Sequence, residues 1–216
     1  MVMFTTSSRQ LRANINHCGI QIPLNDNEIG VYPMSDQLMN ATHYERRAWD
    51  HYETPDWCTE VLLRHEDFTR VWEPAAGKGA IANTLANTGI DVYCSDIHDY
   101  GFGYDVKDFL LTWENKGRDI ITNPPFAEDL ADQFINHALL LTKNFGGKVA
   151  MLLRNEFDCA SSRKGMFGNA SPFACKIVLT RRPKWIEGTT GSPRHNYAWY
   201  LWDWQWGQVP NIVYDK

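Results

Sequence analysis

The residues best suited to chemistry are Asn123, Pro124, Pro125 and Phe126, which follow a β-branched run at residues 120–122. Pro124 holds Asn123 in an extended backbone conformation, and Pro125 does the same to Pro124 and suits the start of a helix. Asn123 adds a side-chain carbonyl and an NH2 group. The motif therefore predicts a rigid cluster of hydrogen-bond acceptors at the end of a buried strand, with an aromatic ring beside it.

This cluster suits a planar amino group. The side-chain oxygen of Asn123 and the backbone oxygen of Pro124 would accept both amino hydrogens, which draws the nitrogen lone pair out of conjugation and aims it at an electrophile. Phe126 would stack on the attached ring. The alternative is a strand-to-helix turn in which Asn123 only caps the helix, as isolated Asn-Pro pairs commonly do. Pro-Pro-Phe after a buried strand favours the amino-group site.

A glycine-rich turn, EPAAGKGA at residues 73–80, follows one strand-like segment and opens a helix-like one. Gly77 and Gly79 would let a ligand approach the backbone closely. The turn lacks the Ser or Thr of a phosphate loop. Asp96 ends the next strand, about 20 residues on, where carboxylates of nucleotide-binding sheets accept hydrogen bonds from ribose. A turn or helix-capping role is the alternative for Asp96, and its spacing from the glycines favours ribose.

The elements that must position these residues alternate between strand-like and helix-like patterns from about residue 46. Thr54 is a candidate N-cap and Pro55 a first helical residue, and residues 130–141 carry an amphipathic stripe. The pattern predicts an α/β fold with a doubly wound, seven-stranded, mostly parallel sheet whose last strand is antiparallel. Ligands of such sheets bind outside the carboxyl ends of the strands, at the switch point. The expected strands are 69–73, 91–97, 103–111, 119–122, 147–154, 176–185 and 198–204.

Length and composition favour one globular domain, residues 46–216, preceded by a polar extension or cap, residues 1–45. The chain has 216 residues, of which 44% are hydrophobic and 22% charged, as expected of a soluble domain with a sizeable core. It has no apolar run long enough for a membrane span and no secretory signal. Its five scattered cysteines suggest neither zinc nor disulfides, so we expect a cytoplasmic protein without a metal.

Charge is unevenly distributed along the chain. The net charge is −5, but residues 154–194 carry +5 and the remainder −10. A basic face on an acidic body is compatible with nucleic acid, and scattered surface charge is the alternative. If the segment contacts nucleic acid, the residues expected to do so are Arg163, Lys164, Arg181, Arg182, Lys184, Trp185 and Arg194.

Aromatic residues divide into two groups. Trp185 would either stack on a target base or pack against the sheet, and the sequence leaves both open. Trp199, Trp202, Trp204 and Trp206 are predicted to be core residues, because alternation places aromatic side chains on both faces of a strand covered on both sides. Residues 158–173, which include Arg163 and Lys164, are expected to form a mobile loop.

Taken together, the Asn-Pro-Pro-Phe motif and the Glu-Pro-x-x-Gly-x-Gly turn resemble those of class I S-adenosylmethionine-dependent methyltransferases, most closely small DNA N6-adenine methyltransferases of bacterial and phage type. The resemblance covers roughly residues 50–205 and implies S-adenosylmethionine as cofactor. It implies that residues 123–126 are catalytic. The implied cofactor-binding residues are Tyr52, Thr54, Pro55, Glu73, Ala75, Gly77, Gly79, Asp96, Ile97, Asp108, Phe109 and Asn123, with Asp105 competing with Asp108 for the cofactor adenine.

The implied reaction is direct in-line transfer of a methyl group to the N6 amine of adenine in DNA, with the base flipped out of a duplex. No large target-recognition domain is evident, so we expect short or relaxed sequence specificity. Adenine in RNA and glutamine in protein pose the same chemical problem and remain alternatives. A cofactor-binding module that has lost catalysis is another, disfavoured by the intact motif.

Overall fold

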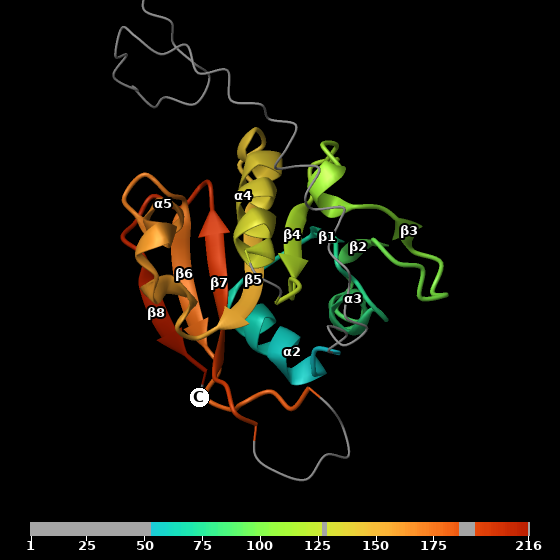
Figure 1. The fold of residues 1–216 in the computed structure, drawn as a ribbon, viewed down its shortest axis with the longest axis horizontal. Helices are drawn as coiled ribbons and strands as arrows, with labels where there is room; N and C mark the ends of the chain where they lie inside the picture. Colours follow the sequence, from blue (N-terminus) through green and yellow to red (C-terminus); the bar gives the residue numbers. More distant parts are fainter. Residues whose placement is uncertain (1–52, 127–128, 186–192, 216) are drawn as a thin grey trace, which may run out of the picture. The chain divides into compact units, whose positions relative to one another are not determined.

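The computed structural model describes residues 53–126, 129–185 and 193–215, all within one compact unit that spans Tyr44–Lys216 (Figure 1). The predicted extension, residues 1–45, lies outside the described residues. The helices are α2 (Asp56–His65), α3 (Ala80–Ala86), α4 (Leu130–Lys143) and α5 (Lys164–Phe167), with short 3-10 helices η2 (Phe109–Leu111), η3 (Phe157–Cys159) and η4 (Ser161–Arg163). The strands are β1 (Arg70–Glu73), β2 (Asp91–Asp96), β3 (Asp105–Val106), β4 (Asp119–Thr122), β5 (Lys148–Arg154), β6 (Phe173–Val178), β7 (Tyr197–Asp203) and β8 (Asn211–Tyr214).

These strands form one sheet in the order β3-β2-β1-β4-β5-β7-β6-β8, in which β7 is antiparallel to both of its neighbours. The predicted fold class, a doubly wound and mostly parallel α/β sheet, is confirmed. The strand order reverses between β1 and β4, which places the switch point beside the ends of these two strands.

Three details differ from the expectation. Strand β3 covers only Asp105–Val106 of the expected range 103–111, whose end forms η2. The sheet has an eighth strand, β8, which pairs in parallel with β6, so the antiparallel strand is the seventh and not the last. The sequence of β8 is short and its residues are mostly exposed, which leaves little hydrophobic pattern to detect. In addition β6 ends at Val178 and not at residue 185. Pro183, which lacks a backbone N–H, lies within the seven residues that leave the sheet.

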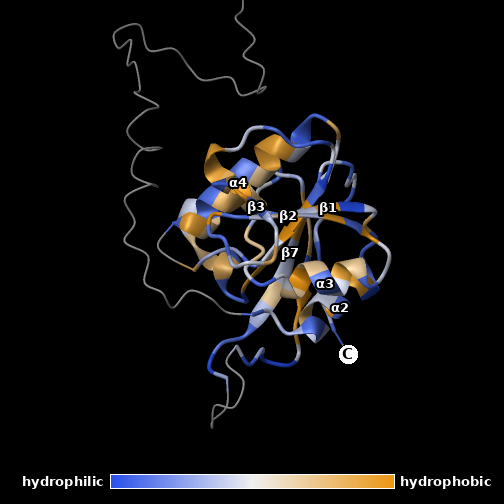
Figure 2. Ribbon diagram, turned by 90° about the vertical axis from the view of Figure 1, so that its right-hand side faces the viewer, coloured by the Kyte–Doolittle hydropathy of each residue, from blue (hydrophilic) through white to orange (hydrophobic). Residues whose placement is uncertain are grey.

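Helices cover both faces of the sheet, with α4 on one side and α2 and α3 on the other (Figure 2). Alternate residues of each strand face the two cores. Val71, Ile121 and Trp199 are buried on the α2 side, and Trp72 and Phe134 both contact the buried ring of Phe109 on the α4 side. This two-sided burial is typical of a doubly wound sheet.

The tryptophans of β7 are core residues, as predicted, whereas Trp204 and Trp206, which follow the strand, are only partly buried. Trp199 and Trp202 are both fully buried. The indole N–H of Trp199 donates to the carbonyl of Cys58 in α2 at 2.7 Å. That of Trp202 donates to the carbonyl of Met166 in α5 at 2.8 Å, on the opposite face. Strand β7 therefore fixes helices on both sides of the sheet.

Candidate active site

The Asn-Pro-Pro-Phe motif lies immediately after β4, at the carboxyl edge of the sheet. The side-chain NH2 of Asn123 donates to the hydroxyl of Thr54 at 3.2 Å. The side-chain oxygen of Asn123 is buried and has no hydrogen-bond partner among the described residues. A buried carbonyl oxygen without a partner costs free energy, so its persistence here suits a ligand that donates to it.

Helix α4 begins at Leu130, so Pro125 does not start it as expected. Asp129, just before the helix, has a left-handed backbone with φ 57° and makes no side-chain cap. Asn123 likewise caps no helix, which removes the simple turn as an explanation of the motif.

The ring of Phe126, the last residue of the motif, contacts two further aromatic rings. Phe126 lies 6.1 Å from the ring of Trp185 and 5.9 Å from that of Tyr197, between ring centroids. Trp185 and Tyr197 meet edge to face at 4.8 Å. Trp185 therefore both packs against the sheet and borders the motif, so the two alternatives for this residue are not exclusive. Tyr197 was missed in the sequence, although its place at the start of β7, opposite the end of β5, puts it at the same edge.

Asp96 ties the glycine turn to the end of β2. Its carboxylate accepts the backbone N–H of Gly77 at 2.9 Å and that of His98 at 3.0 Å. Only 8% of Asp96 is exposed, whereas Ile97 beside it is 38% exposed. Each carboxylate oxygen retains a second lone pair. The residue predicted to bind ribose is thus held rigidly, at the place where the turn and β2 meet.

Gly79 has a structural reason to be glycine. Its φ is +84°, a left-handed conformation, and a Cβ on it would collide with the hydroxyl of Tyr104. We expected a ligand to approach the backbone at Gly79, but the side chain of Tyr104 occupies this space. Tyr104, half-buried over the turn, carried no sequence signal. Burial raises the pKa of its hydroxyl, and the neighbouring Cys94 and Glu73 add to the effect.

Glu73, at the end of β1, is a buried acid. It is 2% exposed, and its Oε2 has no hydrogen-bond partner among the described residues. Burial raises the pKa of the Glu73 carboxyl well above its ordinary value. The hydrogen bond from the Ala82 N–H lowers the pKa, and the nearby charge of Asp96 raises it. Because β1 and β4 are neighbours, Glu73 and Asn123 present two unpartnered buried oxygens at adjacent strand ends. A ligand with a positive charge or N–H donors would satisfy both.

The remaining residues that we predicted to bind the cofactor differ in their exposure and in their hydrogen-bond partners. Asp108 caps η2 by accepting from the N–H of Leu110 at 3.0 Å. Its competitor Asp105 is exposed and accepts from the Tyr93 hydroxyl at 2.8 Å. The ring of Phe109 is 2% exposed, so it is a core side chain. Ala75 is half-buried in the glycine turn, and Tyr52 lies outside the described residues.

The first residues of α2 also differ from the expectation. Pro55, and not Thr54, occupies the N-cap position, and no side chain caps the helix. Thr54 is 4% exposed, and its hydroxyl contacts Asn123. The Thr54 hydroxyl is therefore directed at the motif and not at its own helix.

The segment between β5 and β6, expected to be a mobile loop, contains η3, η4 and α5. Arg163 donates to Asp132 at 2.8 Å and to the carbonyl of Phe157 at 3.0 Å, with its guanidinium 3.7 Å from the Phe157 ring centroid. Lys176 is 8% exposed and pairs with Asp158 at 3.0 Å. Arg163 and Lys176, two of the eight basic residues of 154–194, are thus paired with acidic residues of the protein itself. Lys164 is exposed in α5.

The other predicted basic contacts lie in the segments that follow β6 and precede β7. The guanidinium of Arg181 lies 4.0 Å from the Trp57 ring centroid, in the first turn of α2. Arg182 donates to Asn196 at 2.8 Å and so ties the segment after β6 to the start of β7. Lys184 and Arg194 are exposed and make no ion pair within the described residues. These side chains come from the two segments that also supply Trp185 and Tyr197.

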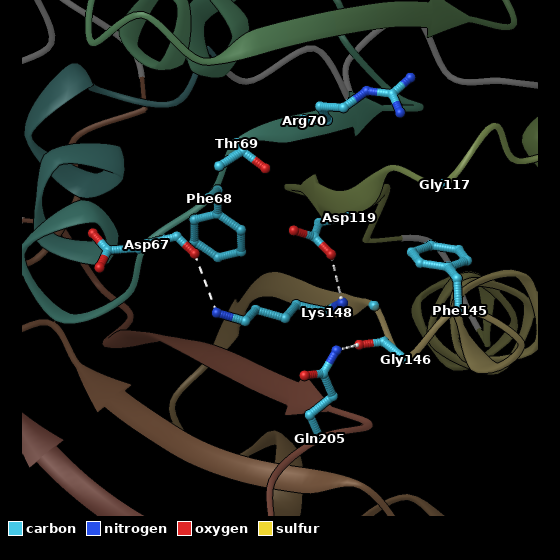
Figure 3. A pocket seen from close by; sticks show the side chains of 11 residues that line it. Asp67, Phe68, Thr69, Arg70, Gly117, Asp119, Phe145, Gly146, Lys148 and Gln205 are labelled. Carbon is cyan, nitrogen blue, oxygen red and sulfur yellow. Dashed lines mark hydrogen bonds between the residues drawn. The ribbon is translucent and has the colours of Figure 1, made fainter.

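A cavity of about 350 Å³ lies at the opposite edge of the sheet (Figure 3). It is lined by residues that begin β1, β4 and β5, among them Arg70, Asp119 and Lys148. Asp119 accepts from the backbone N–H of Lys148 at 2.7 Å, and the Lys148 ammonium pairs with Glu66. The buried carboxyl and the ammonium of this cavity are satisfied by their own neighbours, and the cavity is remote from the motif.

Within the described residues there is no group of acidic, His or Cys side chains that could hold a metal ion. No helix there is long and apolar enough to cross a membrane.

Comparisons with known proteins identify the fold. No family model and no curated protein matches the sequence. Among solved structures, the chain is similar to PH1948 from Pyrococcus horikoshii, a proposed RNA methyltransferase, with a TM-score of 0.56 and 14% identity over 74% of this chain and 91% of that chain. A lower similarity, TM-score 0.43 with 14% identity over 67% and 93%, links it to an rRNA methylase from Streptococcus thermophilus. At such low identity the likeness shows a shared Rossmann-like fold.

Proposed function

We propose that this protein is an S-adenosylmethionine-dependent methyltransferase that transfers a methyl group to the exocyclic N6 amine of adenine in DNA. One observation carries the proposal. At the switch point of a doubly wound sheet, Asn123 presents a buried carboxamide oxygen without a partner among the described residues, and Phe126 of the same motif meets Trp185 edge to face. An acceptor of this kind suits an amine that must be held and activated.

The residues at this edge fit the cofactor. Glu73 offers a buried acceptor to a cationic methionyl group, and Asp96 with Gly77 shapes the place for a ribose. The cofactor, when bound, supplies an electrophilic methyl group on a sulfonium. Asp108 is the better placed acid for the adenine, since Asp105 is engaged with Tyr93 and Lys107 on the exposed surface.

The chain's own residues then activate the acceptor. The oxygens of Asn123 and Pro124 accept the two amine hydrogens, which localises the nitrogen lone pair. Phe126 and Trp185 provide aromatic surfaces for the base. With the cofactor bound, a carbon–nitrogen bond would form as the carbon–sulfur bond of the cofactor breaks, and the amine would then lose one proton to solvent. Orientation and oriented dipoles, rather than a covalent intermediate, supply the catalysis.

Nucleic acid is the substrate class favoured by the charges. Lys184 and Arg194 are exposed cations on the segments that border the aromatic rings. RNA is the second candidate, and the similarity to PH1948 is compatible with it. If the substrate were a glutamine side chain of a protein, which is uncharged, Lys184 and Arg194 would have no evident role in binding it. We further propose that the protein works in the cytoplasm and requires no metal.

The decisive experiment incubates the protein with labelled S-adenosylmethionine and, separately, unmethylated duplex DNA, single-stranded DNA, RNA and protein. Nucleoside and peptide analysis by mass spectrometry should find N6-methyladenine in the DNA arms. N6-methyladenine only in RNA, or methylglutamine only in protein, would move the assignment to that substrate. An absence of methyl transfer in all arms would refute the proposal.

A binding measurement separates an enzyme from a protein without cofactor. S-adenosylmethionine at about 100 times its dissociation constant should raise the free energy of unfolding by about 2.7 kcal/mol. Binding without transfer to any substrate would indicate a module that retains the cofactor site and lacks catalysis. An absence of any shift would exclude the cofactor.

A further inference from the structure

The hydroxyl of Thr54 is used in an unexpected way. A Thr directly ahead of a helix normally turns its oxygen toward the first free backbone N–H groups of that helix. Here the helix starts after Pro55 without any side-chain cap. The Thr54 hydroxyl instead lies 3.2 Å from the Asn123 side-chain nitrogen, 69 residues away in the sequence. With 4% of its surface exposed, Thr54 is shielded from competing water.

This bond decides how the Asn123 carboxamide is placed. The carboxamide can rotate about two side-chain bonds, and its two ends differ chemically, since one donates and the other accepts. With the NH2 group held by Thr54, the oxygen is the end left without a partner. A rotated carboxamide would set its own NH2 group against the hydrogens of an incoming amine, and the two donors would repel.

We propose that Thr54 is a positioning residue that keeps the Asn123 carboxamide oxygen turned toward the amine to be methylated. The inference rests on the proposed function and deepens it. The family resemblance placed Thr54 on the cofactor, whereas the geometry assigns it to the catalytic amide.

Thr54 itself is rigidly supported. Pro55 restricts the backbone of Thr54 to extended conformations, and a β-branched side chain has few rotamers. The helix that follows is fixed to the sheet, because Cys58, Val61 and Leu62 are fully buried and the Cys58 carbonyl accepts from Trp199. The position of the hydroxyl is thus set by the packing of α2 against β7, and a serine, with more rotamers, should hold the amide less firmly.

The test compares Thr54→Val with Thr54→Ser. Thr54→Val keeps the shape and removes the hydroxyl, so kcat for methyl transfer should fall about tenfold, the effect of losing one net hydrogen bond. The dissociation constant of S-adenosylmethionine, measured by calorimetry, should stay within about twofold, because the cofactor is not the partner of the hydroxyl. Thr54→Ser should recover most of kcat. Thr59→Val is the matched control, since Thr59 is a buried threonine of α2 whose hydroxyl has no partner among the described residues.

A double-mutant cycle isolates the pair. In an Asn123→Ala background, Thr54→Val should lower kcat no further, because its effect passes through the carboxamide. An equal additional loss in that background would overturn the proposal. So would a Thr54→Val enzyme with unchanged kcat and weakened cofactor binding, which would make Thr54 a cofactor residue. A wild-type protein that methylates nothing would overturn the proposed function and this inference together, whereas the first two outcomes leave the function intact.

Discussion

Asn123 combines three structural features. It ends a buried strand, it is held by Thr54 through its nitrogen, and its oxygen is buried without a partner within the described residues. A buried acceptor left open is a standing cost in stability. A ligand that donates a hydrogen bond to this oxygen would offset that cost.

At this scale we predict that Asn123→Ala lowers kcat by about 10² to 10³, as does the loss of one oriented polar group at other charge-developing sites. The free energy of unfolding should change little, because the main bond lost is the one to Thr54. Single-turnover methyl transfer with bound cofactor measures the effect. Asn136→Ala, at an exposed position of α4, is the control. A variant as fast as the wild type would place the catalytic centre elsewhere.

Glu73 is the second residue kept in an unfavourable state. Burial raises its pKa in the folded chain above the value of about 4.3 expected when unfolded. Its contribution to stability is therefore present below that value and is lost as the pH rises through the folded pKa. Asp96, Cys94 and Tyr104 face it from β2 and the following loop.

We therefore predict that Glu73→Gln, which stays neutral, becomes more stable than the wild type as the pH rises from about 4.5 to 8. Urea unfolding of both proteins at several pH values, without cofactor, measures the difference in free energy of unfolding. A difference that does not change with pH would mean that Glu73 is ionised in the folded protein throughout this range.

At the scale of elements, the β1–α3 turn depends on contacts from outside its own segment. Gly77 is anchored to Asp96 at the end of β2, and Gly79 lies against Tyr104 from the loop that leads to β3. The turn is thus shaped by the neighbouring strand and loop as much as by its glycines.

Gly79→Ala should consequently destabilise the protein more than Gly101→Ala does. Both glycines have similar positive φ, 84° and 79°, but nothing lies within 4 Å of a Cβ at Gly101. The conformational cost of about 1 kcal/mol or more is common to both, and the difference reports the collision with Tyr104. Chemical denaturation measures it. Equal losses for the two variants would show that Tyr104 moves aside freely.

For the whole molecule, the distribution of charge differs from what the net charge alone suggests. The net charge is −5, and yet exposed cations flank the aromatic rings near the motif. Internal pairing of Arg163 and Lys176 reduces the basic face to fewer side chains than the sequence suggested. Any electrostatic attraction for nucleic acid should then be modest and depend on a few positions.

We predict that the Lys184→Gln, Arg194→Gln double variant weakens DNA binding and makes its salt dependence less steep. The slope of log K against log salt should fall by about 0.9 for each phosphate contact removed. Lys116→Gln with Lys143→Gln is the matched control, because these lysines are also exposed and lie outside the segments that border the motif. Fluorescence anisotropy across a salt series measures both. Equal slopes in the two double variants would exclude this surface as a nucleic-acid contact.

The sequence by itself determined much of the framework, because these features are local. Alternation and turn residues predicted the doubly wound sheet, the core role of Trp199 and Trp202, and the place of residues 123–126 at a strand end. The chemistry that we propose for the motif also rests on its residue types, since two prolines and an amide constrain their own neighbours. The end of β6 at Val178 and the extra strand β8 were missed, because both depend on pairing between segments that carry weak patterns.

Only the tertiary structure decided which distant side chains meet. The hydroxyl of Thr54 accepts a hydrogen bond from Asn123 and does not cap its own helix. Tyr104 fills the space over Gly79. The rings of Trp185 and Tyr197 contact that of Phe126. Lys176, basic in the sequence, is buried against Asp158. The physical reason is common to all of them. Hydrogen bonds and ring contacts are set by strand order and packing across the sheet, and local sequence patterns carry no record of these.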